Sequence, residues 1–157
     1  MIKITAKDIL QDKGGHLVTI NSDASVHQAL TVMTQNKVGS IVVEEDGRIV
    51  GIWTERDLMF RVLEEGFDAK TARLKDNMST NLISVNVDDQ AYQLYDKFVG
   101  RRIRHLLVEE KGDYVGILSV GDVMKASLRQ TSEELRELNK MVSLEYYENW
   151  KEVQSQR

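Results

Sequence analysis

The stretch Gly51-Ile52-Trp53-Thr54-Glu55-Arg56-Asp57 returns later in the chain as Gly116-Ile117-Leu118-Ser119-Val120-Gly121-Asp122. The two stretches begin 116 − 51 = 65 residues apart. Each one indicates an apolar strand, then a hydroxyl residue, then a carboxylate three residues further on. Self-similarity at a fixed spacing is the signature of an internal repeat. The chain is therefore an internal duplication, and each copy ends in the same small chemical unit.

The duplication extends well beyond these two stretches. When residues 18–59 are placed on residues 83–124 without a gap, 12 of the 42 positions are identical. The apolar pattern agrees even where the identities fail, because both copies carry apolar residues at helical spacing. These residues are Val26, Ala29, Leu30 and Met33 in the first copy, and Ala91, Leu94, Tyr95 and Phe98 in the second.

Each copy has the pattern of strand, helix, strand, strand and helix. Asn21-Ser22-Asp23 offers N-cap residues for the first long helix, and the Gly47 and Gly112 regions predict hairpin turns. A short helical turn at 6–10 enters the first copy, and a polar connector at 64–73 joins the two. In the first copy we expect strands at 16–20, 40–43 and 48–53, and helices at 21–36 and from 54. In the second we expect strands at 82–85, 105–108 and 114–118, and helices at 88–99 and 119–129.

Composition is that of an ordinary soluble globular protein. The 157 residues are 41% apolar and 29% charged, with a net charge of −4. That charge gives no footprint for nucleic acid, and no apolar stretch approaches a membrane span. The first eight residues lack the apolar core of a signal peptide. The absence of Cys excludes disulfides, thiolate metal sites and Cys nucleophiles. We therefore expect a cytoplasmic protein with neither a nucleic acid nor a membrane as partner.

Two units that each close on Gly, two apolar residues, Thr or Ser, two further residues and Asp resemble a tandem pair of cystathionine-β-synthase (CBS) domains. The resemblance covers about residues 6–128. It implies an α/β (α+β) fold of two CBS repeats packed as a pseudo-twofold pair, each a small three-stranded sheet with two helices. We expect the first repeat at 1–66, the second at 67–129 and a C-terminal helical extension at 130–157. The family often has Pro after the first strand, whereas this chain has none, so Asn21 and Asn86 have to build those turns.

The repeated hydroxyl and carboxylate admit two interpretations. Thr54 with Asp57, and Ser119 with Asp122, have the spacing of a capping box, which any helix can use without a ligand. A helix start also attracts phosphate, and a carboxylate in its first turn can bind a ribose diol. In CBS domains the hydroxyl residue lies near phosphate and the Asp binds ribose, so the resemblance implies these roles for all four residues.

The resemblance also points to the remaining candidate residues. The family contacts adenine with the region of the first strand, here Val18, Thr19 and Ile20 in one copy and Ile83, Ser84 and Val85 in the other. Basic residues just before the central strand face the phosphates, which implies that role for Arg104 and His105, with Arg56 as a further candidate. The neighbouring Arg101 and Arg102 are equally compatible with a solvated charge run.

These features predict a regulatory module rather than an enzyme. The chain has no Walker loop, no HExxH and no paired nucleophile and base, and its three His are scattered. We expect AMP, ADP or ATP, and no catalytic cofactor or metal, in two clefts that each draw on both copies. The cleft nearer Arg104 and His105 should be the stronger anion site, with its Asp left open. The expected output is energy sensing by a stand-alone homodimer that signals to an unknown regulated protein. The alternatives are another adenosyl ligand (S-adenosylmethionine or NAD), or a structural adaptor with empty clefts.

The last 28 residues lie outside the repeat. Thr131-Ser132-Glu133-Glu134 indicates a helix start, and an apolar stripe at helical spacing follows it. We expect this helix to pack on its own domain, with a dimer-bracing helix as the alternative. The stripe consists of Leu135, Leu138, Val142, Tyr146 and Trp150.

Overall fold

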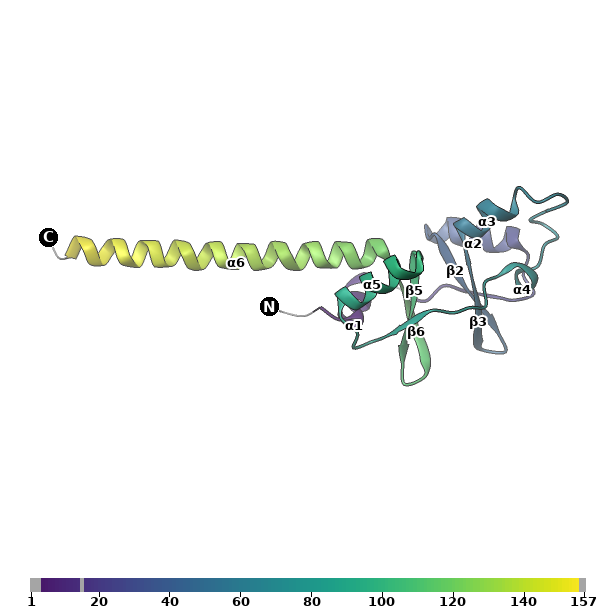
Figure 1. Ribbon diagram of the computed structural model, residues 1–157, viewed down its shortest axis with the longest axis horizontal. Helices are drawn as coiled ribbons and strands as arrows, with labels where there is room; N and C mark the ends of the chain where they lie inside the picture. Colours follow the sequence, from purple (N-terminus) through teal and green to yellow (C-terminus); the bar gives the residue numbers. More distant parts are fainter. Residues whose placement is uncertain (1–3, 15, 156–157) are drawn as a thin grey trace.

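The computed structural model describes residues 4–14 and 16–155, with side chains described through Ser143. It contains two three-stranded sheets side by side and a long helix that leads away from them (Figure 1). The first sheet holds β1 (Thr19–Asn21), β2 (Ser40–Glu45) and β3 (Arg48–Thr54), and the second holds β4 (Ser84–Asn86), β5 (His105–Glu110) and β6 (Asp113–Ser119). The helices are α1 (Ala6–Lys13), α2 (Val26–Asn36), α3 (Glu55–Arg61), α4 (Leu74–Asn77), α5 (Ala91–Arg101) and α6 (Val120–Ser155).

The two sheets have the same topology and the same irregularity. In each, the first strand pairs parallel with the second, and the second pairs antiparallel with the third. The register of the antiparallel pair shifts between Val43 and Glu44 in one sheet and between Val108 and Glu109 in the other, which marks a bulge. The two bulges lie 65 residues apart in the sequence, which is the spacing of the repeat. The predicted duplication and the predicted α/β fold class are therefore confirmed.

The two hairpins close with two-residue turns. Asp46 and Gly47 have φ values of 50° and 75°, and Lys111 and Gly112 have values of 54° and 92°. Two consecutive positive φ values are typical of a type I′ turn, whose twist matches that of the flanking strands. The hairpin turns predicted from the sequence are thereby confirmed.

Asn builds the turn that follows the first strand of each repeat. The Asn21 side chain accepts a hydrogen bond from the Asp23 backbone N–H at 2.9 Å, and Asn86 accepts one from Asp88 at 3.1 Å. These are Asx turns, and they stand where the family often has a turn built on Pro. The predicted N-cap residues were wrong, however. The N-cap of α2 is Ser25, in a capping box with Gln28, because Asn21 and Asp23 are occupied by the preceding turn.

Helix α1 packs on the second repeat, although the sequence placed it at the entry to the first. Ala6 and Ile9 are buried in the core that includes Leu94, Leu106 and Leu118. The Ala6 backbone N–H also donates to the carbonyl of Asp89 at 2.8 Å. The segment before a repeat in sequence therefore completes the other repeat in space. Sequence spacing alone shows no preference between the two.

The segment between the repeats completes the first core. Leu74 of α4 is fully buried among Val26, Ile41 and Trp53, and Phe67 packs at the edge of the same cluster. The expected polar connector at 64–73 is therefore only partly polar. Its apolar residues were missed because they are isolated among charged ones, which hides any periodicity.

Helix α6 is one continuous helix of 36 residues rather than two. Thr131, expected to start a separate helix, lies in its interior and donates its hydroxyl to the carbonyl of Ser127 at 3.0 Å. This bond satisfies the hydroxyl without breaking the helix. Val123 and Ala126 are buried on the second core, whereas residues 131–143 are exposed apart from the half-exposed Glu134. The expectation that the tail packs on its own domain was wrong through residue 143, and the side chains of Tyr146 and Trp150 lie outside the described ones.

Candidate functional site

Two clefts lie between the repeats, and each draws on both of them. Cleft A is formed by Ile52, Thr54, Glu55, Arg56, Asp57, Ser79, Asn81, Ile83, Ile103, Arg104, His105 and Leu107. Cleft B is formed by Lys13, His16, Val18, Lys37, Val38, Gly39, Ser40, Val42, His105, Ile117, Ser119 and Asp122. Their cavity volumes are ≈ 180 and ≈ 220 Å³.

The two clefts are related by the repeat. Cleft A has four aliphatic walls, from Ile52, Ile83, Ile103 and Leu107. The positions 65 residues away supply the four aliphatic walls of cleft B, which are Ile117, Val18, Val38 and Val42. Both clefts therefore offer an apolar slot of similar make-up, and they differ mainly in their polar groups.

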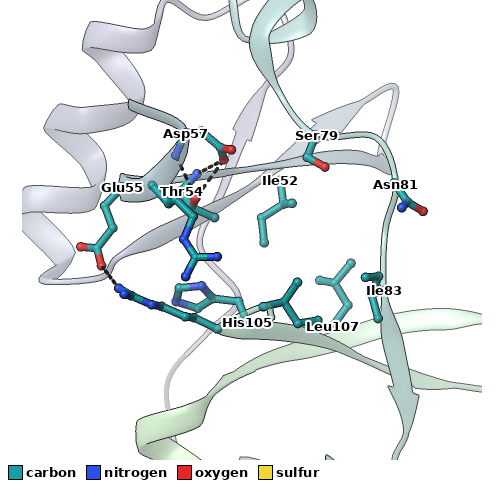
Figure 2. Close-up of a pocket in the computed structure, with 12 residues that line it drawn as sticks. Ile52, Thr54, Glu55, Asp57, Ser79, Asn81, Ile83, His105 and Leu107 are labelled. Atoms are coloured by element: carbon teal, nitrogen blue, oxygen red, sulfur yellow. Dashed lines mark hydrogen bonds and ion pairs between the residues drawn. The ribbon is translucent and has the colours of Figure 1, made fainter. Parts of the chain in front are cut away.

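Thr54 and Asp57 form a complete capping box at the start of α3 and also face cleft A (Figure 2). One oxygen of Asp57, Oδ2, accepts from the Thr54 backbone N–H at 2.8 Å and from the Thr54 hydroxyl at 2.9 Å. Among the described residues, Asp57 receives hydrogen bonds from Thr54 alone. Because the cap uses Oδ2, Oδ1 remains for a ligand, so capping and binding are compatible.

Another capping box that contains an Asp shows that the cap itself implies no site. At the start of α1, Asp8 accepts from the Thr5 backbone N–H at 2.9 Å and from its hydroxyl at 2.7 Å. Those two hydrogen bonds from Thr5, the largest influences, hold the pKa of Asp8 below its usual value. Neither residue lines cleft A or cleft B. The position of Asp57 beside the cleft, rather than its hydrogen bonds, makes it a candidate.

Two arginines connect the repeats at cleft A. Arg104 of the second repeat lies 3.5 Å from the carboxylate of Glu55 in the first, and both side chains are largely exposed. Arg56 of the first repeat donates to the carbonyl of Arg102 in the second at 2.8 Å. Both guanidinium groups line the cleft, where each can present its planar fork to an anion. Arg104 and Asp57 therefore line the same cleft, a pairing that the sequence left open.

In cleft B, the ammonium of Lys13 pairs with the carboxylate of Asp122. Lys13 Nζ lies 2.9 Å from Asp122 Oδ2 and 3.0 Å from the carbonyl oxygen of Ile117. Burial, the largest influence, raises the pKa of Asp122, but hydrogen bonds from Ser119 and Lys13 together outweigh it, so the net shift is downward. Ser119 and Asp122 form the capping hydrogen bonds seen at Thr54 and Asp57.

His105 lines both clefts. Figure 2 shows it opposite Thr54, on the same side of cleft A as Leu107 and Ile83. Burial is the main influence on its pKa and lowers it, so the imidazole is neutral near pH 7. His105 therefore brings a hydrogen-bonding ring to cleft A rather than a positive charge.

The clefts bring together nine of the thirteen site residues expected from the sequence. Thr54, Arg56, Asp57, Ile83, Arg104 and His105 line cleft A, and Val18, His105, Ser119 and Asp122 line cleft B. The other four, all among the described residues, lie outside both linings. Ile20 and Val85 face the cores, Thr19 is exposed, and Ser84 bonds to Glu109 at 3.3 Å. Strand alternation accounts for Thr19 and Ser84, which point away from the face that carries Val18 and Ile83. Ile20 and Val85 share that face but lie further along the strand, where they pack in the cores.

Other lining residues were missed by sequence reasoning. Ile103 and Leu107 flank the Arg104-His105 pair, and applying the offset of 65 would have identified Val38 and Val42 as their counterparts. Lys13 had no such signal, because α1 reaches cleft B only through the exchange of segments between repeats. Among the described residues, no group of three or more His, Asp or Glu side chains is placed to hold a metal ion. Within the same residues, no helix has the length and apolar character required to cross a membrane.

Comparison with known proteins agrees with this architecture. The family model described as CBS domain matches residues 6–64 and 73–129. The mitochondrial CBS domain-containing protein CBSX3 of Arabidopsis thaliana is 31% identical over 144 residues, which are 86% of this chain and 70% of that protein.

Solved structures of CBS-domain proteins also resemble this chain. A CBS-domain protein of Agrobacterium tumefaciens is 36% identical, with a TM-score of 0.74, over 78% of this chain and 92% of that one. A CBS domain protein of Pyrobaculum aerophilum complexed with AMP is 25% identical, with a TM-score of 0.67, over 76% of this chain and 89% of that one.

Proposed function

This chain belongs to the CBS domain family, and from that premise we propose that it is a regulatory module which binds an adenosine-type ligand in cleft A. The observation that carries the proposal is the combination of groups in that cleft. Asp57 has one oxygen, Oδ1, that could accept hydrogen bonds from a ribose diol. Aliphatic side chains form walls that suit a purine, and two arginines in the same lining could bind phosphate. This combination fits a nucleotide better than it fits a purely apolar or purely ionic ligand.

We favour AMP, ADP or ATP over adenosyl ligands without a terminal phosphate. Arg56 and Arg104 both line cleft A, and a guanidinium binds phosphate oxygens in pairs. The relative of Pyrobaculum aerophilum complexed with AMP supports this choice. A protein that distinguishes these three nucleotides would sense the energy state of the cell. S-Adenosylmethionine and NAD remain the alternatives for the same cleft.

The contacts between the repeats suggest how binding becomes a signal. Arg104 reaches across cleft A to Glu55, and Arg56 reaches across to the carbonyl of Arg102. A phosphate that binds the guanidinium of Arg56 or Arg104 competes with these contacts. Because a ligand shifts an equilibrium only by its differential affinity for the two states, this competition favours a different arrangement of the repeats. A regulated partner protein would read that arrangement.

We further propose that the module works as a homodimer. The region around α3 exposes Met59, Phe60 and Leu63, with Leu63 85% exposed, and α5 exposes Tyr92 and Val99. Apolar patches of this kind usually mark interfaces. A twofold dimer would bury them in a self-complementary way. The cytoplasmic location expected from the sequence stays a prediction.

The proposal is tested by ligand binding to the purified full chain. A panel of AMP, ADP, ATP, NAD, S-adenosylmethionine and GTP would be screened by thermal unfolding and then by titration calorimetry. A ligand that binds only the native state at a hundredfold excess over its Kd stabilises it by about 2.7 kcal/mol. We expect the adenine nucleotides to raise the melting temperature most. A chain that no member of the panel stabilises would instead be the structural adaptor considered above.

A further inference from the structure

The two clefts have matching apolar walls but differ at the carboxylate. Each of the four aliphatic residues of cleft A has an aliphatic counterpart 65 residues away in cleft B. Each cleft also has a hydroxyl residue and an Asp in the same capping geometry. On these features alone, both clefts would take the same ligand. The difference lies in what else touches each Asp.

One carboxylate oxygen of Asp122, Oδ2, already accepts three hydrogen bonds. Its Oδ2 accepts from the Ser119 backbone N–H at 2.8 Å, from the Ser119 hydroxyl at 2.8 Å and from Lys13 Nζ at 2.9 Å. The pair is largely enclosed, with the Lys13 side chain 33% exposed and the Asp122 side chain 25% exposed. A second bond, from Lys13 to the carbonyl of Ile117 at 3.0 Å, fixes the ammonium at the wall of the cleft.

Beside cleft A, the carbonyl of Ile52, which is the counterpart of Ile117, accepts a hydrogen bond from the Ser79 backbone N–H at 3.0 Å instead of from an ammonium. The residue 65 positions after Lys13 is Met78. Both follow the same local pattern, since Ile9 and Leu74, also 65 residues apart, are each buried in a core four residues earlier. In the packing, however, Met78 takes the place of Leu10, since Met78 lies against Gly51 and Leu10 lies against the matching Gly116. Asp57 is left, among the described residues, with Thr54 as its sole hydrogen-bond partner.

We propose that Lys13 is a resident cation that closes cleft B to ribose, so that each chain binds one adenosine-type ligand, in cleft A. The proposal rests on the proposed function and assigns its site. A ribose diol donates most strongly to a carboxylate that has no cation beside it. In cleft B the Lys13 ammonium already neutralises the carboxylate of Asp122, so the remaining oxygen, Oδ1, is a weaker acceptor than Oδ1 of Asp57. Displacing Lys13 leaves a partly enclosed charge without its partner, which is unfavourable.

A phosphate bound in cleft B would give Lys13 the opposite role. Lys13, His16 and Lys37 all line cleft B, and such groups could hold a phosphate. The contacts favour the first role, because Asp122 and the carbonyl of Ile117 already engage the Lys13 ammonium. If Lys13 instead held a phosphate, its removal would weaken binding rather than create a site.

Titration calorimetry with AMP on the full chain distinguishes these roles by stoichiometry. We expect one AMP per natural chain and two per Lys13→Met chain, in which the cation is replaced by an uncharged side chain of similar length. Asp57→Ala should weaken the natural site roughly ten- to a hundredfold. The double variant Asp57→Ala/Lys13→Met should regain one tight site, which would then lie in cleft B. Lys13→Arg keeps the cation and should keep a single site.

Lys7→Met provides the matched control. Lys7 lies on the same helix and pairs with Glu110 at 3.6 Å, away from both cleft linings, so its loss should leave one site. Melting curves without AMP confirm that each variant is folded. Two sites in the natural chain, or one site in Lys13→Met, would overturn the role of Lys13. The absence of AMP binding in all variants would instead overturn the proposed function.

Discussion

At the scale of single residues, the capping boxes that contain an Asp distinguish a role in stability from a role in binding. Asp57 and Asp8 make the same two hydrogen bonds to the preceding Thr, but only Asp57 lines cleft A. We expect Asp57→Ala and Asp8→Ala each to lower the free energy of unfolding by about 1 kcal/mol, from loss of the cap. Asp57→Ala should also weaken AMP binding roughly ten- to a hundredfold, because a charge-assisted pair to ribose is lost.

Urea unfolding and calorimetry on the two variants measure these effects separately. Asp8→Ala serves as the control for the cap and should bind AMP with natural affinity. If Asp57→Ala also keeps natural affinity, the repeated motif is a cap and nothing more.

His105 should make stability depend on pH. Burial, the largest influence, lowers its pKa below 6.5; Lys13 and Arg104 lower it further, and Glu55 and Asp122 oppose them. A group whose folded pKa is lowered contributes stability above its unfolded pKa, and that stability is lost as the pH falls through the folded pKa. We therefore expect the natural chain to lose more stability between pH 7.5 and pH 5.5 than His105→Gln, measured by urea unfolding. Equal losses would mean that His105 is not desolvated.

At the scale of elements, the two type I′ turns are chemically unequal. The first is Asp46-Gly47, whereas the second places Lys111 at a φ of 54° before Gly112. Asn adopts positive φ more easily than Lys, and Asn-Gly is the preferred pair for this turn. We expect Lys111→Asn to raise the free energy of unfolding by about 0.5–1 kcal/mol.

Lys111→Val is the matched control for this turn, because β-branched residues resist positive φ and should destabilise it. Both changes lie outside the cleft linings, so AMP affinity should not change. A Lys111→Asn chain no more stable than the natural one would contradict the assignment of the turn.

Elements whose signals are local could be predicted from the sequence, and elements that depend on tertiary exchange could not. The hairpins were predictable because Asp46-Gly47 and Gly112 encode their turns directly. The N-cap of α2 was misplaced because Asn21 serves the preceding turn, and both uses favour the same residue types. The packing of α1 on the second core carries no sequence signal at all.

The candidate site shows the same division. Thr54, Asp57, Ser119 and Asp122 were predictable because the repeat marks them, and the clefts contain all four. Lys13 was not predictable, since it lies 109 residues from Asp122 in sequence and reaches it only through the packing of α1. The sequence predicts an asymmetry in the basic residues at Arg104, whereas the asymmetry at the two carboxylates becomes visible only in three dimensions.

At the scale of the whole molecule, two groups of exposed apolar residues, besides those on α5, are candidates for the dimer interface. One is the α3 region, with Phe60 63% and Leu63 85% exposed, and the other is the projecting part of α6, with Leu138 57% exposed (Figure 1). We expect a homodimer held by the first group, with a mass by light scattering of about twice 18.0 kDa. Phe60→Glu/Leu63→Glu should then be a monomer, because the substitution places charges in the interface.

Leu138→Glu is the matched change on α6 and should leave the dimer intact, as should truncation after Gln130. A natural chain that is monomeric at micromolar concentration would refute the dimer. A dimer lost on truncation would place the interface on α6 instead.

The central claim is that cleft A binds an adenosine-type ligand, and methyl NMR during titration with AMP tests it most directly. Ile52, Ile83 and Ile103 report on cleft A, and their counterparts Ile117, Val18 and Val38 report on cleft B. We predict saturable shifts of the three cleft A methyl groups, with those of cleft B nearly unchanged. Shifts confined to cleft B, or no saturable shift in either cleft, would contradict the account.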